Sequence, residues 1–582
     1  MDTMSLRITK FYRIALFIVI VLILGFFTYI YFGQHMELSS ILKTNYTSNI
    51  STIIVPHYNL ESEKRLNFIK SIKDRAATDK IVLISVNHLN EGNGNIIATD
   101  KKWDFFGKGN VKLNQLLLNN LTSNNVVKNE LGPFTNEHGV FNVLPDLVST
   151  WPDAQFLPII IKDSTPKSEV DNLLNNLNES CPDCLIVASI DLSHYNPNSL
   201  AQIHDSSTIS ALSTTNANKA WSSETDSPQS MYLATSWANL HKTTNFHLNY
   251  HTNSGELAKD NTAETTSYLL GYYTSSASDK TDLVASTSFL FGGDLMFDRG
   301  VNHFYKDTGI KSVFDNLGNR VFWGVDLAIA NLEGPISETA INDDYLSGSM
   351  IFNFPPDAIN ALKYLGVNAL SLANNHSENA GQKGLDYTRQ LLTDSNITPI
   401  GSQTKYNSTS VKNFKTDISL AVIGVDMLED PNLDSIDSDI KANEANYVIV
   451  YPHWGAEYQV KHGSSQENLA KRWIDAGADL IIGSHPHVVQ DCQIYKGKFI
   501  AYSMGNFVFD QNFSQETMRG MLVGGIISKQ STTISLFPIS INKSQPQLST
   551  GSNRQLYLDR CLASLDNSLF NKVSEDTITI NN

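Results

Sequence analysis

The chain has 582 residues, of which 41% are hydrophobic and 18% charged. At roughly 150 residues per domain this length predicts about two to four domains, and the composition excludes both a disordered chain and a polytopic membrane protein. The formal charge is -16, from 43 Lys and Arg against 59 Asp and Glu. Because an acidic protein repels phosphate backbones, nucleic acid is excluded as the main partner.

An apolar segment near the N-terminus predicts a membrane anchor. Residues 14–32 are apolar and would rise about 28 Å as a helix, close to the thickness of the hydrocarbon core. The basic flank is Arg7, Lys10 and Arg13. Since such a flank stays cytoplasmic, we expect a cytoplasmic segment at 1–13, a stalk at 33–50 and extracytoplasmic domains on a single-pass protein of the cell membrane. A cleaved signal peptide is the alternative, but its apolar region would be shorter and no Ala-x-Ala follows.

Residues 51–273 predict an α/β domain. Aliphatic runs at 51–55, 81–86 and 185–190 are expected as buried strands with helices between them. Their C-terminal ends deliver His57, His88, and Asp191 with His194. Three imidazoles and a carboxylate could hold one metal ion with an open position. The alternative is that each histidine satisfies a buried carbonyl group.

A small, polar segment at 274–286 predicts a linker to a second α/β domain at 287–530. Its strands are expected at 288–291, 326–330, 369–373, 448–451 and 480–482. Each strand again ends beside a residue that can bind a metal or move a proton. Residues 531–582 are expected as a C-terminal extension with a β segment at 532–541.

The side chains at these five strand ends indicate a two-metal centre. They are hard-oxygen and imidazole donors that suit Mn, Fe or Zn: Asp294, Glu333, Asn375, His376, His453, His485 and His487. His485 and His487 could point their rings at neighbouring metal sites, because side chains two apart share a face of a strand. Gly292 and Gly293, just before Asp294, are expected to allow a close approach of the backbone to a metal site. For any single histidine, a structural hydrogen bond is the competing interpretation.

The four cysteines do not make a disulfide scaffold. Cys181 and Cys184 have CxxC spacing, and without a second such pair we favour a local surface disulfide in an oxidising compartment. The spacing leaves open whether Cys492 and Cys561 are free or paired.

The second domain resembles the CapA family, the capsule and poly-γ-glutamate synthesis accessory proteins with a calcineurin-like metallophosphoesterase fold. The matching stretches are Phe291-Gly-Gly-Asp-Leu-Met-Phe-Asp-Arg299, Ala330-Asn-Leu-Glu-Gly-Pro335, Ala373-Asn-Asn-His376, His453-Trp-Gly-Ala-Glu-Tyr458, Gly483-Ser-His-Pro-His487 and Tyr502-Ser-Met-Gly-Asn-Phe507. The resemblance implies an α/β sandwich with metal ligands at Asp294, Glu333, Asn375, His453, His485 and His487 and with His376 as the acid beside the leaving group. Asp294 is also expected to be catalytic. Two positions depart from the pattern: Met296 stands where metallophosphoesterases place a His, and Asn379 where relatives have an Asp.

The first domain resembles the Memo family, protein B of the AmmeMemoRadiSam system, related in fold to the LigB-type dioxygenases. The resemblance is carried by Val55-Pro-His57, Val86-Asn-His88, Glu137-His138, Ser189-Ile-Asp-Leu-Ser-His-Tyr195 and Asn253-Ser-Gly-Glu256. It implies an Fe or Cu pocket at His57, His88, His194 and Asp191, with His138 as a ligand or beside one. Near the last motif this chain has Ser254 where some relatives supply a Cys ligand.

These patterns predict a metal-dependent hydrolase that acts on a cell-envelope polymer such as poly-γ-glutamate, beside a membrane-bound amide ligase or export complex. The alternative is a non-catalytic subunit for polymer export or tethering, which Met296 and Asn379 favour. In either case the Memo-like domain could be a separate redox-metal or binding module.

Overall fold

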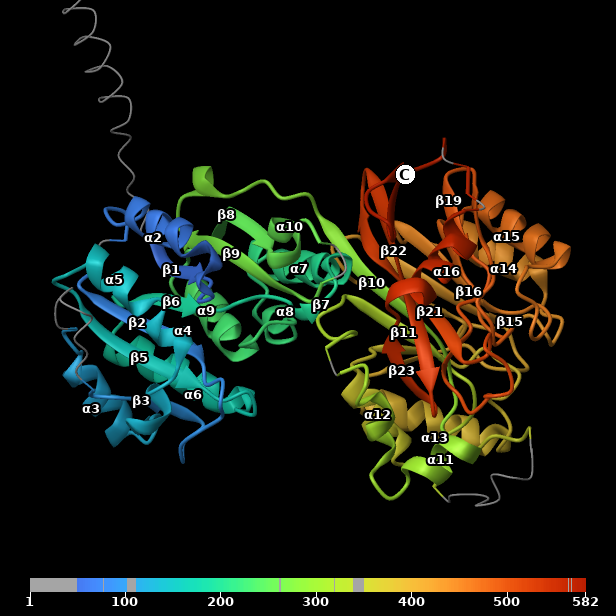
Figure 1. The fold of residues 1–582 in the computed structure, drawn as a ribbon, viewed down its shortest axis with the longest axis horizontal. Coiled ribbons are helices and arrows are strands. Elements are labelled where there is room, and N and C mark those ends of the chain that lie inside the picture. Colours follow the sequence, from blue (N-terminus) through green and yellow to red (C-terminus); the bar gives the residue numbers. More distant parts are fainter. Residues whose placement is uncertain are drawn as a thin grey trace, which may run out of the picture. The chain divides into compact units, whose positions relative to one another are not determined.

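The computed structural model describes residues 50–582 except 77, 102–110, 261–262, 319, 339–349, 564 and 567. Ile50–Asn582 forms one compact unit. Within it, one large sheet lies in the N-terminal half and two sheets lie in the C-terminal half (Figure 1).

The N-terminal half is built on a nine-stranded mixed sheet in the order β4-β3-β5-β2-β6-β1-β9-β7, with β8 on β9. The strands are β1 (Ile50–Val55), β2 (Lys80–Val86), β3 (Ile96–Ala98), β4 (Lys128–Asn129), β5 (Gln155–Ile161), β6 (Leu185–Ser189), β7 (His194–Asn196), β8 (Asn245–Asn253) and β9 (Thr265–Thr274). The central strands β5, β2, β6 and β1 are parallel. Their carboxyl ends therefore meet at one edge, which gathers His57, His88 and Asp191.

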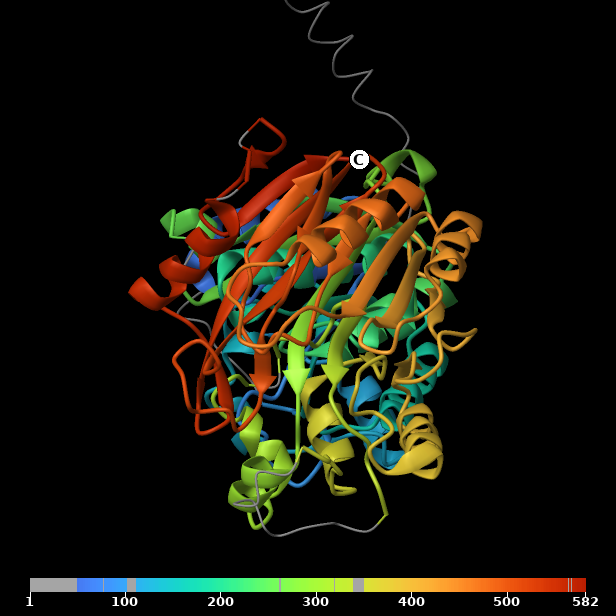
Figure 2. The same ribbon diagram turned by 90° about the vertical axis from the view of Figure 1, so that its right-hand side faces the viewer.

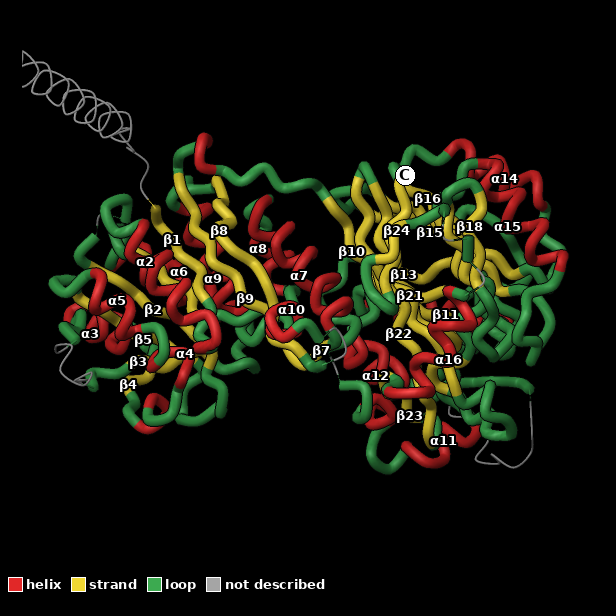
Figure 3. The backbone as a smooth tube through the Cα atoms, turned by 45° about the horizontal axis from the view of Figure 1, so that its top comes forward, coloured by secondary structure: helices red, strands yellow, loops and turns green. Residues whose placement is uncertain are grey.

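Helices cover both faces of this sheet, which is why its parallel strands β1 and β2 are buried along almost their whole length and are mostly aliphatic (Figure 3). The helices are α2 (Ser62–Ser71), α3 (Gln115–Ser123), α4 (His138–Phe141), α5 (Leu144–Thr150), α6 (Lys167–Ser180), α7 (Asn198–Ser213), α8 (Ala217–Trp221), α9 (Pro228–Leu240) and α10 (Ser254–Ala258). Ile54 packs in one core with α3, α6 and α9, whereas Ile53 and Val55 pack in the other with α2 and α5. This alternation is the two-residue period of a strand.

The C-terminal half is a sandwich of two sheets (Figure 2). The ten-stranded sheet holds β10 (Ser286–Leu295), β11 (Leu327–Leu332), β12 (Ala369–Ser371), β13 (Thr398–Ile400), β20 (Asn506–Val508), β21 (Arg519–Ser528), β22 (Ser531–Asn542), β23 (Gln545–Leu548), β24 (Asn571–Lys572) and β25 (Thr577–Asn581). The six-stranded sheet holds β14 (Val411–Phe414), β15 (Leu420–Asp426), β16 (Tyr447–His453), β17 (Leu480–Ile482), β18 (Cys492–Tyr495) and β19 (Lys498–Ala501).

Apolar side chains of both sheets fill the space between them. Phe289 and Phe291 of β10 share a core with Ile449 and Tyr451 of β16, while Leu290 turns to the outer face. The outer faces carry α12 (Ala358–Leu365) and α13 (Gly381–Asp394) on one sheet, and α14 (Leu433–Ala442) and α15 (Ser464–Ala476) on the other. The remaining helices are α11 (Arg299–Tyr305) and α16 (Gly551–Leu562). Each sheet of the sandwich is therefore covered by the other sheet on its inner face and by helices on its outer face.

Every strand expected from the sequence forms, with slightly different ends. The expected β segment at 532–541 is β22, which pairs with β21 on one side and with β25 on the other. The residues beyond 530 therefore contribute β22, β23, β24 and β25 to the ten-stranded sheet.

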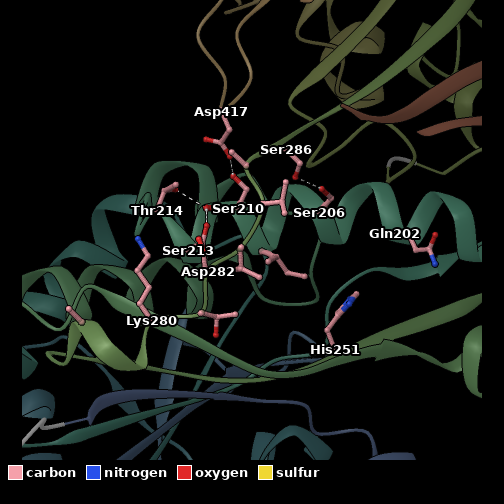
Figure 4. A pocket seen from close by; sticks show the side chains of 16 residues that line it. Gln202, Ser206, Ser210, Ser213, Thr214, His251, Lys280, Asp282, Ser286 and Asp417 are labelled. Carbon is pink, nitrogen blue, oxygen red and sulfur yellow. Dashed lines mark hydrogen bonds between the residues drawn. The ribbon is translucent and has the colours of Figure 1, made fainter. Parts of the chain in front are cut away.

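Helix α7 contributes to the cores of both halves. Leu200 and Ile203 near its start belong to the core of the C-terminal half, whereas Ala211 and Leu212 near its end belong to that of the N-terminal half. Polar contacts join the same helix to the second half: Ser206 and Ser286 share a hydrogen bond of 3.0 Å, and Ser210 donates to Asp417 (Figure 4). The segment expected as a linker runs beside this helix.

The expected fold class and single-pass localisation need a correction. Across the described residues, no helix is long and apolar enough to cross a membrane. The longest helix there, α7, has 16 residues, would span only about 24 Å, and is rich in serine. Residues 14–32, on which the expectation rested, lie outside the described residues. The fold of the described residues is mixed α/β with several sheets, and none of their helices could cross a membrane.

Two disulfides are present. Cys181 pairs with Cys184 as expected, but both residues are buried rather than at the surface. Cys492 of β18 pairs with Cys561 of α16, which the spacing had left open. Such bonds are typical of an oxidising compartment.

Candidate metal centres

The strand ends of the C-terminal half bring the expected ligands together between the two sheets. Asp294 lies in β10 and Glu333 directly follows β11, both in the ten-stranded sheet. His453 ends β16 of the six-stranded sheet, and His485 and His487 lie in the loop after β17. All five are buried.

A first group of ligand atoms consists of Asp294, Glu333 and His487, which lie within 4.8 Å of one another. His487 Nδ1 is 3.4 Å from Asp294 Oδ2, and His487 Nε2 is 3.4 Å from Glu333 Oε1. A second group, Glu457, His485 and His487, meets the same limit. Since His487 belongs to both groups, it lies between two adjacent candidate positions for a metal ion.

His453 and Asn375 adjoin the second group. His453 Nε2 is 3.1 Å from His485 Nδ1 and 2.9 Å from Asn375 Oδ1. His453 Nδ1 contacts Ser484 Oγ at 3.0 Å, which fixes the ring from its far side. The structure thus assembles all six residues expected as ligands around one buried space.

The electrostatics of this space fit a bound cation. Burial, and then the neighbouring Asp294, raise the pKa of Glu333 well above its usual value. Its Oε1 accepts no hydrogen bond within the described part of the chain. Burial also lowers the pKa of His485 to about 4 and that of His453 well below its usual value, so both rings are neutral and can donate lone pairs. The donor set suits Mn, Fe or Zn.

His376 is held beside these groups by asparagines. Its Nδ1 is 3.0 Å from Asn379 Oδ1, which also accepts a hydrogen bond from Phe352 N (2.8 Å). We place the ring proton on Nδ1 because this amide oxygen can only accept. Asn375 Nδ2 then donates to His376 Nε2 at 3.3 Å. Asn379 therefore orients His376 at the position where relatives have an Asp.

Met296, the other departure, is a fully buried core residue. Its Sδ accepts a hydrogen bond from Asp298 N at 3.1 Å. A thioether is a weak acceptor and a poor ligand for hard cations, so the first group lacks the imidazole that metallophosphoesterases usually supply here.

Three polar residues join the site that were not assigned from the sequence. Glu457 supplies a carboxylate to the second group. Asn331 donates to Asp294 Oδ1 (2.9 Å), and Asn506 Oδ1 is 3.0 Å from His487 Nδ1. Each lies inside a stretch that carries the CapA resemblance, so the motif itself was the available signal.

The rings of His485 and His487 are not placed by a strand. Both residues have positive φ angles, 95° and 57°, and their ring centroids are 5.9 Å apart. A non-glycine residue with positive φ is strained, and such strain is concentrated at functional sites. The two rings reach neighbouring groups because of this loop and not because of strand alternation.

Asp426, at the end of β15, is another buried acid near the site. Leu428 N donates to its Oδ1 at 3.0 Å, whereas its Oδ2 has no hydrogen-bond partner in the described ranges. Burial raises its pKa from 3.8 to about 7. The folded protein thus disfavours the ionised carboxyl group, and this cost is absent below about pH 4 and complete above about pH 7.

We therefore expect Asp426→Asn to match the wild type in free energy of unfolding near pH 4 and to exceed it at pH 8. At about 1.4 kcal/mol per pKa unit, the gain at pH 8 is up to about 4 kcal/mol. Urea denaturation of chelator-treated protein at the two pH values measures it. An equal difference between the two proteins at both pH values would contradict the prediction.

The N-terminal half holds a second cluster. His57, His88 and His138 place ring nitrogens within 4.8 Å of one another, and so do His57, Asp191 and Asp226 with their ligand atoms. His57 Nε2 is 3.1 Å from Asp226 Oδ2 and 3.5 Å from Asp191 Oδ2. His57 is therefore common to an imidazole group and a carboxylate group.

His194 belongs to neither group, although it lines the same cavity. Its Nδ1 is 2.6 Å from Leu192 O. His138 and Asp226 take part directly, and His88 Nδ1 is held by Glu137 Oε1 at 2.6 Å. His138 is the first residue of α4 and directly follows Glu137. The sequence had left open whether His138 is a ligand or lies beside one.

The charges of this cluster differ from those of the first. Burial lowers the pKa of His57, but Asp191 and Asp226 together outweigh it and raise the pKa to about 9. Burial, and then the neighbouring His88, lower the pKa of His138 to about 4.

Comparison with known proteins identifies both halves. Residues 288–511 match the family described as bacterial capsule synthesis protein PGA_cap, and residues 31–270 match the Memo-like protein family. The chain thus joins a Memo-like region to a region of the capsule synthesis family. Both families and their order agree with the resemblances seen in the sequence.

Curated relatives also match the chain, among them the following three. Capsule biosynthesis protein CapA of Bacillus anthracis is 27% identical over 310 residues, which cover 49% of this chain and 72% of the relative. PGA biosynthesis protein CapA of Bacillus subtilis is 28% identical over 286 residues, covering 46% and 74%. A probable polyglutamine synthesis accessory protein of Mycobacterium tuberculosis is 25% identical over 282 residues, covering 38% and 74%.

Proposed function

We propose that residues 288–511 form a metal-dependent hydrolase that acts on a cell-envelope polymer during capsule or poly-γ-glutamate synthesis. The observation that carries the proposal is the pair of ligand groups joined by His487. The names of the curated relatives support the polymer context. An amide ligase or export complex of the same pathway is the partner that this role requires.

The residues of the site suit this chemistry. The two ligand groups that share His487 would hold a pair of divalent metal ions, which would supply an activated water and stabilise the charge that develops on the reacting group. His376 Nε2 carries no proton in this structure, so it would first take the proton that the attacking water releases and then pass it to the leaving group, while Asn379 holds Nδ1 and keeps the ring in place. Asn375 links the ring to the ligand His453, because its two amide atoms contact one ring each.

A non-catalytic subunit for polymer export or tethering is the second candidate. Met296 favours it, since a buried thioether replaces an imidazole of the first metal group. In that case the first group would bind metal weakly, and the region would hold the polymer without cleaving it. The Memo-like half would then act as a separate redox-metal or binding module, which the cluster of His57, His88 and His138 favours.

Replacement of His376 by alanine tests the enzyme. We expect kcat to fall by about 100-fold or more on a chromogenic phosphodiester or on poly-γ-glutamate, because a positioned proton donor contributes about that much. Metal content should stay unchanged, since His376 lies outside both ligand groups. The full-length chain is assayed by mass spectrometry for metal and by product release for hydrolysis.

His303→Ala in α11 is the matched control and should keep both properties. If the fully metal-loaded wild type hydrolyses neither substrate but retains poly-γ-glutamate in a pull-down, the hydrolase is wrong and the subunit is favoured.

A further inference from the structure

The metal-site cavity of the Memo-like region is completed by a residue of the capsule-type region. The cavity has a volume of about 520 Å³ and is lined by His57, His88, His138 and Asp226 of the cluster. Arg320, from beyond the 274–286 segment, lines the same cavity. It is the sole Lys or Arg among the described lining residues, and its side chain is 44% exposed.

Arg320 is fixed from one side only. Its Nη1 donates to Glu224 Oε1 at 2.9 Å and to Thr225 O at 3.2 Å. Within the described ranges no acceptor contacts Nη2 or Nε, and the exposed part of the side chain borders the cavity. A guanidinium group held in this way can present a second edge to a ligand without losing its own support.

Glu224 connects this arginine to His194, which lines the same cavity as the metal cluster. It is fully buried, its Oε2 accepts a hydrogen bond from His194 N at 3.3 Å, and its other oxygen holds Arg320. Although burial raises the pKa of Glu224, its partners His204 and Arg320 lower it to about 2, so the carboxylate is charged. Glu224 therefore sets the position of Arg320 relative to the strand that carries His194.

The rest of the lining restricts the ligand. Asp163 and Glu264 also line the cavity and repel a polyanion. Tyr58 and Tyr195 line it as well and are exposed, at 52% and 70%. Tyr195 has a φ of 58°, a strained conformation that turns a residue next to His194 toward the opening. A ligand here is small, and it has one anionic end.

We propose that this cavity binds a small oxyanion, a carboxylate or a phosphate, between the metal cluster at His57, His88 and His138 and the guanidinium group of Arg320. Arginine pairs with either anion through two parallel hydrogen bonds, which gives geometric selectivity as well as affinity. The capsule-type region thereby determines what the Memo-like region binds.

The test uses the full chain carrying His487→Ala, so that cobalt is held by the N-terminal cluster and its visible spectrum reports ligands there. Malonate and inorganic phosphate are titrated as probes. We expect Arg320→Ala to weaken binding of the better probe by about tenfold or more, the effect of losing a charged hydrogen-bond partner, with cobalt content unchanged. The probe that binds more tightly identifies the source of the oxyanion.

Two further variants guard the interpretation. Arg320→Gln keeps an amide donor toward Glu224 but removes the charge, and it should show the same loss if Arg320→Ala does not fold. Arg472→Ala removes an arginine that is paired with Asp434 and Asp437 away from the cavity, and it should bind both probes normally. Unchanged affinity in Arg320→Gln, equal loss in Arg472→Ala, or no response of the spectrum to either probe would overturn the proposal.

Discussion

Replacement of His487 by alanine is expected to remove about two equivalents of metal from each chain. The ring contacts Asp294 through Nδ1 and Glu333 through Nε2, and it also belongs to the group with His485. Its loss leaves the first group with two carboxylates only and the second group with Glu457 and His485, so hydrolysis should fall by more than about 100-fold, the upper effect of losing a residue that merely supports a ligand. Metal analysis and rate measurements on the full-length protein check both values.

The N-terminal cluster serves as an internal reference in this measurement. Metal held by His57 and its neighbours should remain when His487 is replaced, because the two sites share no residue. His303→Ala should leave the total unchanged. Loss of a single equivalent would mean that His487 serves one position only, and no loss would contradict the shared-ligand arrangement.

Gly293→Ala should destabilise the protein and also disturb its metal site. A Cβ atom at this position would lie 2.1 Å from Gly505 O, a backbone atom that has no room to move. The same carbonyl accepts the hydrogen bond from Asp294 N at 3.1 Å. We expect the free energy of unfolding to fall by about 3 kcal/mol, the upper range for an overpacked core, and metal affinity to fall with it.

Urea denaturation of chelator-treated protein separates the first effect from the second. Gly132→Ala is the matched control, because an added Cβ meets no atom within 4 Å there. Equal free energies of unfolding for the Gly293 and Gly132 variants would contradict the prediction, because they would mean that β10 can move away from Gly505 without loss of stability. The glycine pair was expected to permit a close approach of the backbone to a metal site, whereas the atom that Gly293 approaches is the backbone carbonyl oxygen of Gly505.

The strands could be predicted because buried strands appear in the sequence as short runs of aliphatic residues. Residues 480–482 are aliphatic, and so are residues 81–86 apart from Ser85, which is the pattern of a strand covered on both faces. Polar residues directly after such runs, such as His88, then had to lie at a sheet edge. The N-terminal membrane helix was wrong as a part of the fold, because it was inferred from hydropathy alone and no described helix supports it.

The completeness of the sites could not be predicted in the same way. Glu457 lies in a loop four residues after His453, and its approach to His485 depends on loop conformations with positive φ. His194 shares its sequence motif with Asp191, yet its ring turns to Leu192 O and leaves its place to His138. Arg320 lines the N-terminal cavity although it is far in sequence from the cluster residues, and no local sequence pattern predicts such a contact.

Helix α7 has a consequence for how this protein can evolve. Leu200 and Ile203 are completely buried against the other half, so a gene that encoded the Memo-like region alone would expose them to water. A recombination event that exchanged either half for a distant homologue would meet the same mismatch. Selection therefore acts on the two halves as one inherited unit, even where each performs its own chemistry.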